Sequence, residues 1–279
     1  MSSTATIFRS DDGLTFTSTV FTRSHTIASA VRYAPTNSDR VYATGWFYRP
    51  SATWIFRSDD GGQTFVERAH VLPDSGTLEL LAVSPVDQEL ILVRSGGIEA
   101  EYLYRSSDSG DSLSLVLTST LAIRDATFSE DGRTVWVSST ARMFRSEDSG
   151  RTFELMPSPV RNACTGMVGG DLWVCGWPWI DHFAVGRQEP AGAFEGAWNL
   201  DEIRGILECP AASPIHQFCE PIWPLVKSQL GIDDPPPPTE PGCDCRARRS
   251  KPNFFEIAGL ISCLVLLGRC RRPRRKFQK

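Results

Sequence analysis

The stretch Ser58-Asp59-Asp60-Gly61-Gly62-Gln63-Thr64-Phe65 decides the fold of this chain of 279 residues. It recurs as Ser146-Glu147-Asp148-Ser149-Gly150-Arg151-Thr152-Phe153, more loosely as Ser106-Ser107-Asp108-Ser109-Gly110-Asp111-Ser112-Leu113, and one residue short as Ser10-Asp11-Asp12-Gly13-Leu14-Thr15-Phe16. The leading serines, at positions 10, 58, 106 and 146, are 48, 48 and 40 residues apart. A regular spacing of about 40–50 residues indicates stacked or radially arranged repeat units.

A short apolar run that ends in an arginine precedes every copy of this turn. Such a run predicts a β-strand that enters the turn, and the last residues of each copy start the next strand. Asp and Ser side chains accept hydrogen bonds from backbone amides two or three residues further on, and glycine supplies positive φ. Each copy is therefore predicted to be a hairpin turn. The apolar runs are Ile7-Phe8-Arg9, Ile55-Phe56-Arg57, Leu103-Tyr104-Arg105 and Met143-Phe144-Arg145.

The turn resembles the Asp-box, the Ser-x-Asp-x-Gly-x-Thr-aromatic repeat of bacterial neuraminidases that also occurs in sortilin-type and xyloglucanase-type β-propellers. The resemblance implies a folding element between the third and fourth strands of a propeller blade, away from the ligand face. It therefore implies a structural role for the matching residues. These residues are Ser10, Asp12, Gly13, Thr15 and Phe16; Ser58, Asp60, Gly62, Thr64 and Phe65; Ser106, Asp108 and Gly110; and Ser146, Asp148, Gly150, Thr152 and Phe153.

Two further strands are predicted in each unit, because β-branched and apolar residues are enriched in two segments that turn residues separate. Four strands make one blade, so residues 1–200 are predicted to be an all-β β-propeller with about four and a half four-stranded blades. In the fifth unit the turn has decayed to Gly186-Arg187-Gln188-Glu189-Pro190. The added strands are predicted over residues 27–33 and 40–47, 78–83 and 90–93, 124–128 and 134–138, and, in the fifth unit, 162–168, 171–176, 182–187 and 196–200.

The first residues of the chain resemble the third strand of a unit rather than the start of a blade. Closed propellers have roughly four to eight blades, and an open arc leaves strand edges unpaired. The first twenty residues also lack the charged n-region and the apolar h-region of an export signal. These features predict that an N-terminal portion of a longer protein is missing, and closure as an unusually small propeller is the alternative.

Charge is distributed unevenly along the chain. The formal net charge is −4, but residues 246–279 hold eleven Lys or Arg and one acid, Glu256, which leaves −14 for the other residues. An acidic body lacks the basic footprint that nucleic-acid binding requires. We therefore expect no nucleic-acid partner, and the basic residues at the C-terminus are predicted to act at a membrane.

The eight cysteines favour an oxidising compartment. A two-residue turn at Gly169-Gly170 would place Cys164 directly opposite Cys175, with Cα atoms about 4.5–5.5 Å apart, a distance at which a disulfide fits. Cys209 and Cys219 bracket a short loop and form a second candidate pair, contributing about 3 kcal/mol in the chain-entropy model. Four buried thiols are the alternative. The cysteines have no metal-site spacing, so neither a metal nor a cofactor is expected.

Residues 201–230 are predicted to be a cap on the last blade that carries this second cysteine pair. Two stretches, residues 199–203 and residues 221–230, are each predicted to form a helical turn. In the second stretch the apolar residues Ile222, Leu225 and Val226 recur at helical spacing.

A proline-rich spacer with a Cys-x-Cys motif, residues 231–245, leads to a basic stretch and the apolar segment 254–268. A helix of fifteen residues spans about 22 Å, less than the roughly 30 Å of a bilayer core, so an interfacial or buried helix is one alternative. The order of the parts resembles the MYXO-CTERM sorting tail of myxobacterial surface proteins. The resemblance implies a short C-terminal transmembrane helix within a membrane anchor, residues 246–279, and processing at Cys243 or Cys245. Because more basic residues follow the helix than precede it, the C-terminus is expected in the cytoplasm and the propeller outside the cell.

Aromatic residues are prominent in the loops predicted at the rim opposite the repeated turn. Trp and Tyr beside Arg and Asp suit recognition of a sugar or a peptide by stacking and polar contacts. Packing of the same aromatic residues between blades is the alternative. The predicted ligand rim consists of Trp46, Tyr48, Arg49, Arg94, Trp177, Trp179 and Asp181.

No catalytic constellation is recognisable in the sequence. The Phe-Arg-Ile-Pro element of sialidases is absent, and the histidines match neither a nucleophile elbow nor a His-Glu-x-x-His motif. The first hypothesis is therefore a surface-anchored, non-enzymatic module that binds a glycan or protein partner. The second is a surface-anchored glycoside hydrolase of sialidase or xyloglucanase type, which needs two carboxylates that converge at the centre of the ligand rim. An assembly factor similar to the photosystem II assembly propeller is a third possibility.

Overall fold

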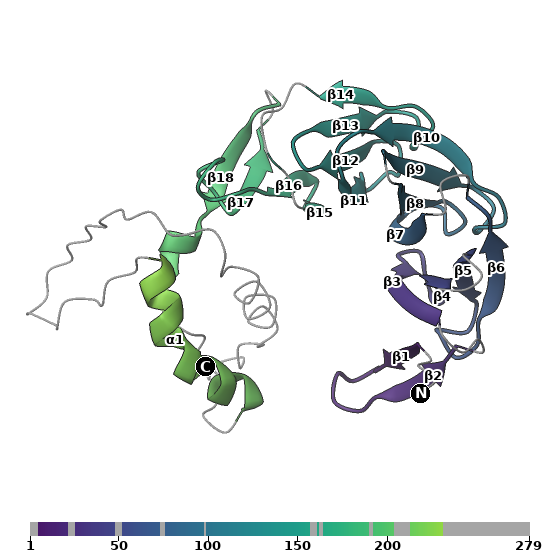
Figure 1. Cartoon of the computed structure of the whole chain (residues 1–279), viewed down its shortest axis with the longest axis horizontal. Helices are drawn as coiled ribbons and strands as arrows, with labels where there is room; N and C mark the ends of the chain where they lie inside the picture. The colour runs from purple at the N-terminus through teal and green to yellow at the C-terminus, as the bar shows by residue number, and fades with distance from the viewer. Residues whose placement is uncertain are drawn as a thin grey trace, which may run out of the picture. The chain divides into compact units, whose positions relative to one another are not determined.

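The computed structural model describes residues 5–21, 26–47, 52–72, 76–97, 99–156, 161, 164–189, 192–203 and 213–230. The chain divides into two compact units, Met1–Trp198 and Asn199–Lys279. The first unit contains all the described strands, and the second contains the described helices (Figure 1).

Five antiparallel sheets follow one another along the first unit, one with two strands and four with four strands. Within every four-stranded sheet each strand pairs with the next one along the chain. The two-stranded sheet consists of β1 (Thr6–Arg9) and β2 (Thr17–Val20). The others consist of β3 (Thr26–Ala34), β4 (Asn37–Phe47), β5 (Ala52–Ser58) and β6 (Val66–His70); β7 (Thr77–Val83), β8 (Ile91–Gly96), β9 (Glu101–Ser106) and β10 (Ser114–Ser119); β11 (Ile123–Phe128), β12 (Val135–Ser139), β13 (Met143–Ser146) and β14 (Glu154–Met156); and β15 (Thr165–Val168), β16 (Asp171–Cys175), β17 (Val185–Gln188) and β18 (Phe194–Trp198).

Neighbouring sheets pack through their first strands. β7 packs against β3 and β4 of the sheet before it, and β11 packs against both β7 and β15. In Figure 1 these first strands lie on the inner side of the row of sheets, while β6, β10 and β14 lie on its outer side. Successive four-stranded meanders that pack in this way are the blades of a β-propeller. The predicted all-β propeller architecture is thus confirmed, with a half blade followed by four full blades among the described residues.

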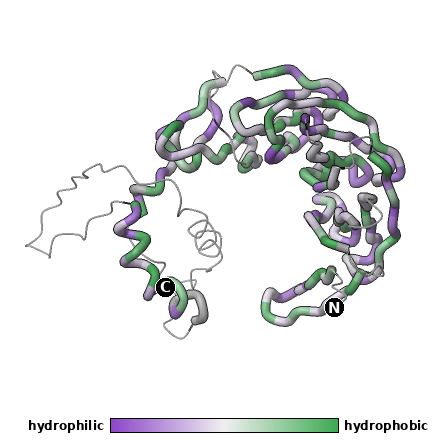
Figure 2. Tube along the Cα trace, viewed as in Figure 1, coloured by the Kyte–Doolittle hydropathy of each residue, from purple (hydrophilic) through white to green (hydrophobic). Residues whose placement is uncertain are grey.

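The core lies between the sheets rather than inside any one of them. Each junction between neighbouring sheets has its own cluster of buried apolar side chains, contributed from both sides. Figure 2 shows the corresponding alternation of hydrophobic and hydrophilic residues along the strands. A strand buried on one face alternates in this way because successive side chains point to opposite faces. Tyr42, Phe56, Leu92 and Met143 are among the side chains that these junctions bury completely.

The four strands of the fifth sheet were predicted less accurately than those of the other sheets. Its third strand was expected over residues 182–187 but begins at Val185, because residues 177–182 form a loop in which the Asp181 carboxylate accepts a hydrogen bond from the Trp177 amide at 2.7 Å. His182 has a φ of 64°, which is incompatible with a strand. The fourth strand ends at Trp198, before the 3₁₀ turn that starts at Leu200.

The second unit contains the 3₁₀ turn η1 (Leu200–Glu202), which a capping box with Asn199 begins, and the helix α1 (Pro214–Leu230). The helix begins before the predicted stretch 221–230, with proline at its first position, where a missing N–H breaks no helical hydrogen bond. Pro221 and Pro224 lie inside it, which explains why the sequence pattern placed the start too late.

The remaining predictions for the second unit concern parts of the chain that the structure does not cover. Cys219 is buried in α1, but its predicted partner Cys209 lies outside the described residues. The spacer 231–245 with Cys243 and Cys245, and the apolar segment 254–268, also lie outside them. Among the described helices, none has the length and apolar character needed to cross a membrane.

Candidate functional site

The meander topology gives each sheet two edges with different roles. The four repeated turns (residues 10–16, 58–65, 106–113 and 146–153) join the third and fourth strands, and the turns between first and second strands lie at the same edge, which we call the turn edge. The start of each first strand and the end of each second strand lie at the opposite edge, which we call the loop edge. The predicted ligand rim belongs to the loop edge.

The repeated turns share one hydrogen-bond pattern. In the second copy, the Ser58 hydroxyl donates to Asp60 Oδ1 at 2.7 Å and accepts from the Gly62 amide at 2.8 Å. Asp60 Oδ1 also accepts from the Gln63 and Thr64 amides at 3.0 and 2.9 Å, and its Oδ2 accepts from the Thr64 hydroxyl at 2.6 Å. The serine, aspartate and glycine bonds recur in the other three copies. Each aspartate therefore uses both carboxylate oxygens to hold its own turn.

These hydrogen bonds lower the pKa of the turn aspartates. The Ser58 and Thr64 hydroxyls lower the pKa of Asp60 to about 2. The backbone amides of Thr15 and Leu14 lower that of Asp12, and the Ser146 and Thr152 hydroxyls lower that of Asp148. Burial raises the pKa of Asp108, but the hydrogen bonds from Ser112 and Ser106 outweigh it, so the net shift is also downward. A carboxylate held in its charged form in this way is unsuited to act as a general acid.

At the loop edge of the third sheet, Arg94 joins two strands through two glutamates. Its Nε and Nη2 donate to Glu79 Oε2 at 2.9 and 2.5 Å, and its Nη1 donates to Glu101 Oε2 at 3.1 Å. Nη1 also donates to the Ile123 carbonyl in the next sheet at 2.9 Å. Arg94 was predicted as part of the ligand rim, and the structure places its guanidinium group in a network that joins three strands of the third sheet to β11 of the fourth.

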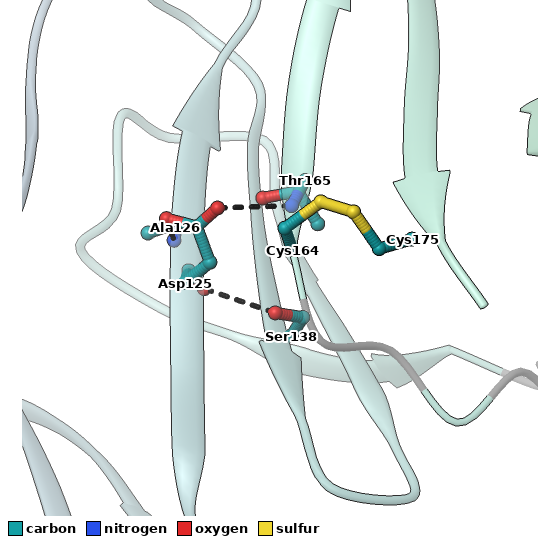
Figure 3. Close-up of a disulfide and its surroundings, with 6 residues drawn as sticks. All are labelled: Asp125, Ala126, Ser138, Cys164, Thr165 and Cys175. Atoms are coloured by element: carbon teal, nitrogen blue, oxygen red, sulfur yellow. Dashed lines mark hydrogen bonds between the residues drawn. A yellow bond between two sulfur atoms is a disulfide. The ribbon is translucent and has the colours of Figure 1, made fainter. Parts of the chain in front are cut away.

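Asp125 links the fourth sheet to the fifth (Figure 3). Its Oδ2 accepts from the Thr165 amide of β15 at 2.9 Å, and its Oδ1 accepts from the Ala126 amide at 2.9 Å. Burial raises the pKa of Asp125, whereas the two amides and the positive charge of Arg32 lower it, and the negative charge of Glu79 adds to the rise. Asp125 and Glu79 therefore lie within electrostatic reach of each other at the loop edge.

The first and second strands of three sheets are bridged at this same edge by different chemistry. In the second sheet the hydroxyls of Ser29 and Thr44 lie 2.9 Å apart. In the fifth sheet a disulfide joins Cys164 to Cys175, the pair that the Gly169-Gly170 turn places opposite each other, with Cα atoms 5.0 Å apart (Figure 3). In the third sheet the register partners Glu79 and Arg94 form the ion pair described above.

The predicted rim residues are brought together only in part. Trp177, Trp179 and Asp181 share the loop between β16 and β17, where the Ile180 and Asp181 amides donate to the Trp177 carbonyl at 2.9 and 2.7 Å. Trp179 is 39% exposed and Ile180 is 40% exposed, so this loop presents apolar surface to solvent. Trp46 lies on β4, three sheets earlier in the row. Tyr48 and Arg49 lie outside the described residues.

The sequence analysis missed Glu79, Glu101 and Asp125. Glu79 and Arg94 are register partners in the β7–β8 hairpin, but a register shift between Leu80 and Ala82 displaces them from the pairing obtained by counting back from the turn. Asp125 stands beside Arg124 in β11 and its partner Thr165 is 40 residues further along the chain, so no local pattern singles it out. In the described part of the chain, His, Cys, Asp and Glu side chains form no group of three that could hold a metal ion.

Comparison with known proteins identifies no family for this chain. No protein-family model matches it, and no curated protein is significantly similar to it in sequence. Solved propeller structures do resemble it. The GH74 enzyme of Niastella koreensis is 19% identical, with a TM-score of 0.48 over 60% of this chain and 29% of that one. The GH74 xyloglucanase of Xanthomonas campestris is 20% identical, with a TM-score of 0.46 over 66% of this chain and 31% of that one.

The Dos1 propeller is 18% identical, with a TM-score of 0.44 over 66% of this chain and 51% of that one. The chain thus spans about half of the Dos1 propeller and less than a third of either GH74 enzyme. Likenesses at this level identify neither a substrate nor a partner.

Proposed function

We propose that this protein is a non-enzymatic binding module of the propeller class, which recognises a glycan or protein partner at the loop edge. The observation that carries the proposal is the state of the carboxylates there. Glu79 and Glu101 are bound to Arg94, and Asp125 accepts from two backbone amides. A carboxylate held in this way supports the scaffold, whereas the exposed aromatic and apolar side chains of residues 177–181 are available for contact.

The four repeated turns support the assignment of the chain as an Asp-box propeller. Their serine, aspartate, glycine and threonine residues are joined by one recurring set of hydrogen bonds, which explains why those residue types recur at those positions. In this assignment the turns stabilise the sheets at the turn edge and leave the loop edge for the ligand.

A glycoside hydrolase is the second candidate, and one observation favours it. Burial raises the pKa of Asp125, as a general acid requires, and the negative charge of Glu79 acts on it. An inverting glycosidase needs such a pair about 6.5–9.5 Å apart. Against this reading, both oxygens of Asp125 accept hydrogen bonds from backbone N–H groups, which leaves the acid poorly placed to donate to a glycosidic oxygen.

A binding experiment with paired variants tests the proposal. Arrays of xyloglucan oligosaccharides, sialylated glycans and peptides would be probed with the wild-type protein, Trp179→Ala and Leu115→Ala. Leu115 is a matched control, because it is 53% exposed but lies on β10, an outer strand of another sheet. We expect Trp179→Ala to lose binding and Leu115→Ala to retain it.

Activity measurements separate the two candidates. Hydrolysis of xyloglucan and of a sialyl substrate would be measured for the wild type, Asp125→Asn and Glu79→Gln. We expect no turnover from any of the three proteins. Turnover by the wild type that both substitutions abolish would overturn the binding proposal in favour of the hydrolase.

We also propose that the protein is held at the cell surface by residues 246–279, with the apolar segment 254–268 in the membrane and Cys243 or Cys245 as the processing site. The support is the order of spacer, cysteine motif, apolar segment and basic cluster in the sequence. Protease treatment of intact cells that express the chain with an epitope tag in the propeller tests it. Protection of the tag from an external protease would contradict the proposed orientation.

A further inference from the structure

The connection between β16 and β17 at the loop edge presents two neighbouring apolar side chains to solvent. Trp179 and Ile180 are both exposed, they are adjacent in the sequence, and they follow Pro178. The part of the ligand rim that the fifth sheet supplies is therefore an aromatic ring beside an aliphatic side chain. We call residues 177–182 the rim loop.

Hydrogen bonds to protein backbone engage the Asp181 carboxylate and several main-chain groups of the rim loop. Asp181 accepts from the Trp177 amide through Oδ2 at 2.7 Å and from the Arg161 amide through Oδ1 at 3.3 Å. The Trp177 carbonyl accepts from the Ile180 and Asp181 amides at 2.9 and 2.7 Å. His182, the other titratable residue of the rim loop, also has an interaction partner. The carboxylate that could grip a polar ligand thus holds the backbone instead.

The base of the rim loop is fixed by a hydrogen bond and by a covalent bond. The Gly176 amide donates to the Ala184 carbonyl at 3.0 Å, which closes the loop. One residue before Gly176, the disulfide holds Cys175 to Cys164 (Figure 3). The two ends of the rim loop are therefore held together and attached to the residue that precedes β15.

Phe183 anchors the end of the rim loop in a space that three glycines leave open. Its side chain is buried. A Cβ on Gly176 or on Gly186 would lie 2.6 Å from Phe183 Cε2, and a Cβ on Gly196 would lie 2.8 Å from Phe183 Cβ. Larger residues at these positions would displace the phenylalanine. An aromatic ring seated in this way fixes where the rim loop rejoins the sheet.

An anchored loop with an exposed tryptophan has the properties of a binding surface. Little conformational freedom is lost when a partner contacts a loop that is already fixed at both ends. Tryptophan is also one of the residue types that most often carry the affinity of an interface. Trp179 and Ile180 are therefore well placed to supply the central contact of a partner.

The chemistry of this surface distinguishes the two partners that the proposed function leaves open. A glycan stacks on an aromatic ring, but a hydroxyl group that it buries against Ile180 loses its hydrogen bonds to water, and burial of a polar group without a partner is costly. An apolar side chain of a protein loses no such bonds and gains from contact with both Trp179 and Ile180.

We propose that the partner at the loop edge is a protein segment, and that an apolar side chain of this segment packs against Trp179 and Ile180. This inference rests on the proposed function and chooses the protein among its two partners. Asp181 holds the rim loop and makes no contact of its own with the partner.

Selection from a phage-displayed library of random dodecapeptides, with an array of xyloglucan and sialylated oligosaccharides in parallel, tests the inference on the full chain. Peptides and glycans that bind would be measured against the wild type, Trp179→Ala, Ile180→Asn, Ile180→Val and Leu115→Asn. Leu115 is the matched control, because it is exposed on β10, an outer strand of another sheet, so Leu115→Asn makes the same kind of change away from the loop edge.

We expect peptides that share an apolar residue to bind the wild type and Leu115→Asn equally well. Ile180→Asn should weaken their binding about three- to twentyfold, the effect of a lost apolar contact of this size, and Ile180→Val should retain most of the affinity. Because Ile180 is exposed, both substitutions are expected to leave the fold intact.

The outcomes separate this inference from the proposed function. Binding of glycans without binding of peptides, or binding of either probe that Trp179→Ala abolishes and Ile180→Asn leaves unchanged, would overturn the inference and leave the proposed function intact. If neither probe binds the wild type, or if Trp179→Ala leaves binding unchanged, both are wrong.

Discussion

Alanine at Gly110 is expected to destabilise the protein more than alanine at Gly62, although the two glycines hold the same place in their turns. Each lies four residues after the leading serine, and their φ angles are +88° and +87°. An alanine at either position has to occupy the left-handed region, which costs about 1–2 kcal/mol. Both substitutions also reduce the freedom of the unfolded chain to the same extent. These backbone effects therefore cancel when the two variants are compared.

Packing against the preceding sheet separates the two positions. A Cβ on Gly110 would lie 2.9 Å from Cγ2 and 3.2 Å from Cδ1 of Ile55, a fully buried side chain of β5. A Cβ on Gly62 would meet only Phe65 Cζ, at 3.8 Å. Overpacking a well-packed site costs typically about 1–3 kcal/mol. We expect Gly62→Ala to lower the free energy of unfolding by about 1–2 kcal/mol and Gly110→Ala to lower it by about 2–5 kcal/mol.

Urea unfolding followed by tryptophan fluorescence measures both losses, and the midpoint can be compared where the slopes agree. The inference that each repeated turn packs against the sheet before it depends on this difference. Equal losses for Gly110→Ala and Gly62→Ala would refute it, because the backbone effect would then account for both variants.

Three further predictions follow from the contacts described above. The pKa of the turn aspartates is lowered on folding, to about 2 for Asp60, from about 4 in the unfolded chain. Their charged form therefore stabilises the fold above pH 4, and this stabilisation is lost as the pH falls toward 2. The urea midpoint of unfolding, measured as a function of pH, should fall steeply in that window. Replacing Cys164 and Cys175, which are 11 residues apart, by serine should lower the free energy of unfolding by about 2–3 kcal/mol in the chain-entropy model, measured by urea unfolding of the oxidised proteins. Glu79→Gln should lower it by about 1 kcal/mol, because Arg94 keeps Glu101 as a partner, and added salt should shrink the difference from wild type in thermal melts.

The local part of the fold could be predicted from the sequence because its determinants are close together in the chain. Ser58, Asp60 and Thr64 act within one turn, and the register of a two-residue hairpin placed Cys164 opposite Cys175. Glu79 and Arg94 are also register partners, but a shift between Leu80 and Ala82 means that counting back from the turn would pair Glu79 with Ser95 instead.

The contacts between sheets could not be predicted in the same way. Arg105 and Ser149 are 44 residues apart, and Asp125 and Thr165 are 40 apart, so no local pattern marks them as partners. Only the packing of successive sheets brings such residues together.

The bridges at the loop edge indicate what this scaffold requires of its sequence. A hydroxyl pair, an ion pair and a disulfide occupy the same place between the first and second strands of three sheets. Each of these three bridges joins the first strand of its sheet to the second near the loop edge. The side chains differ, because one pair is neutral, one is charged and one is covalently linked. A position that tolerates such different chemistry is fixed by geometry, since cross-strand neighbours lie close enough for any pair that attracts. The charge of the loop edge can therefore differ from sheet to sheet while each sheet keeps its fold. A propeller can vary its ligand at such an edge and keep the repeated turns at the other edge unchanged.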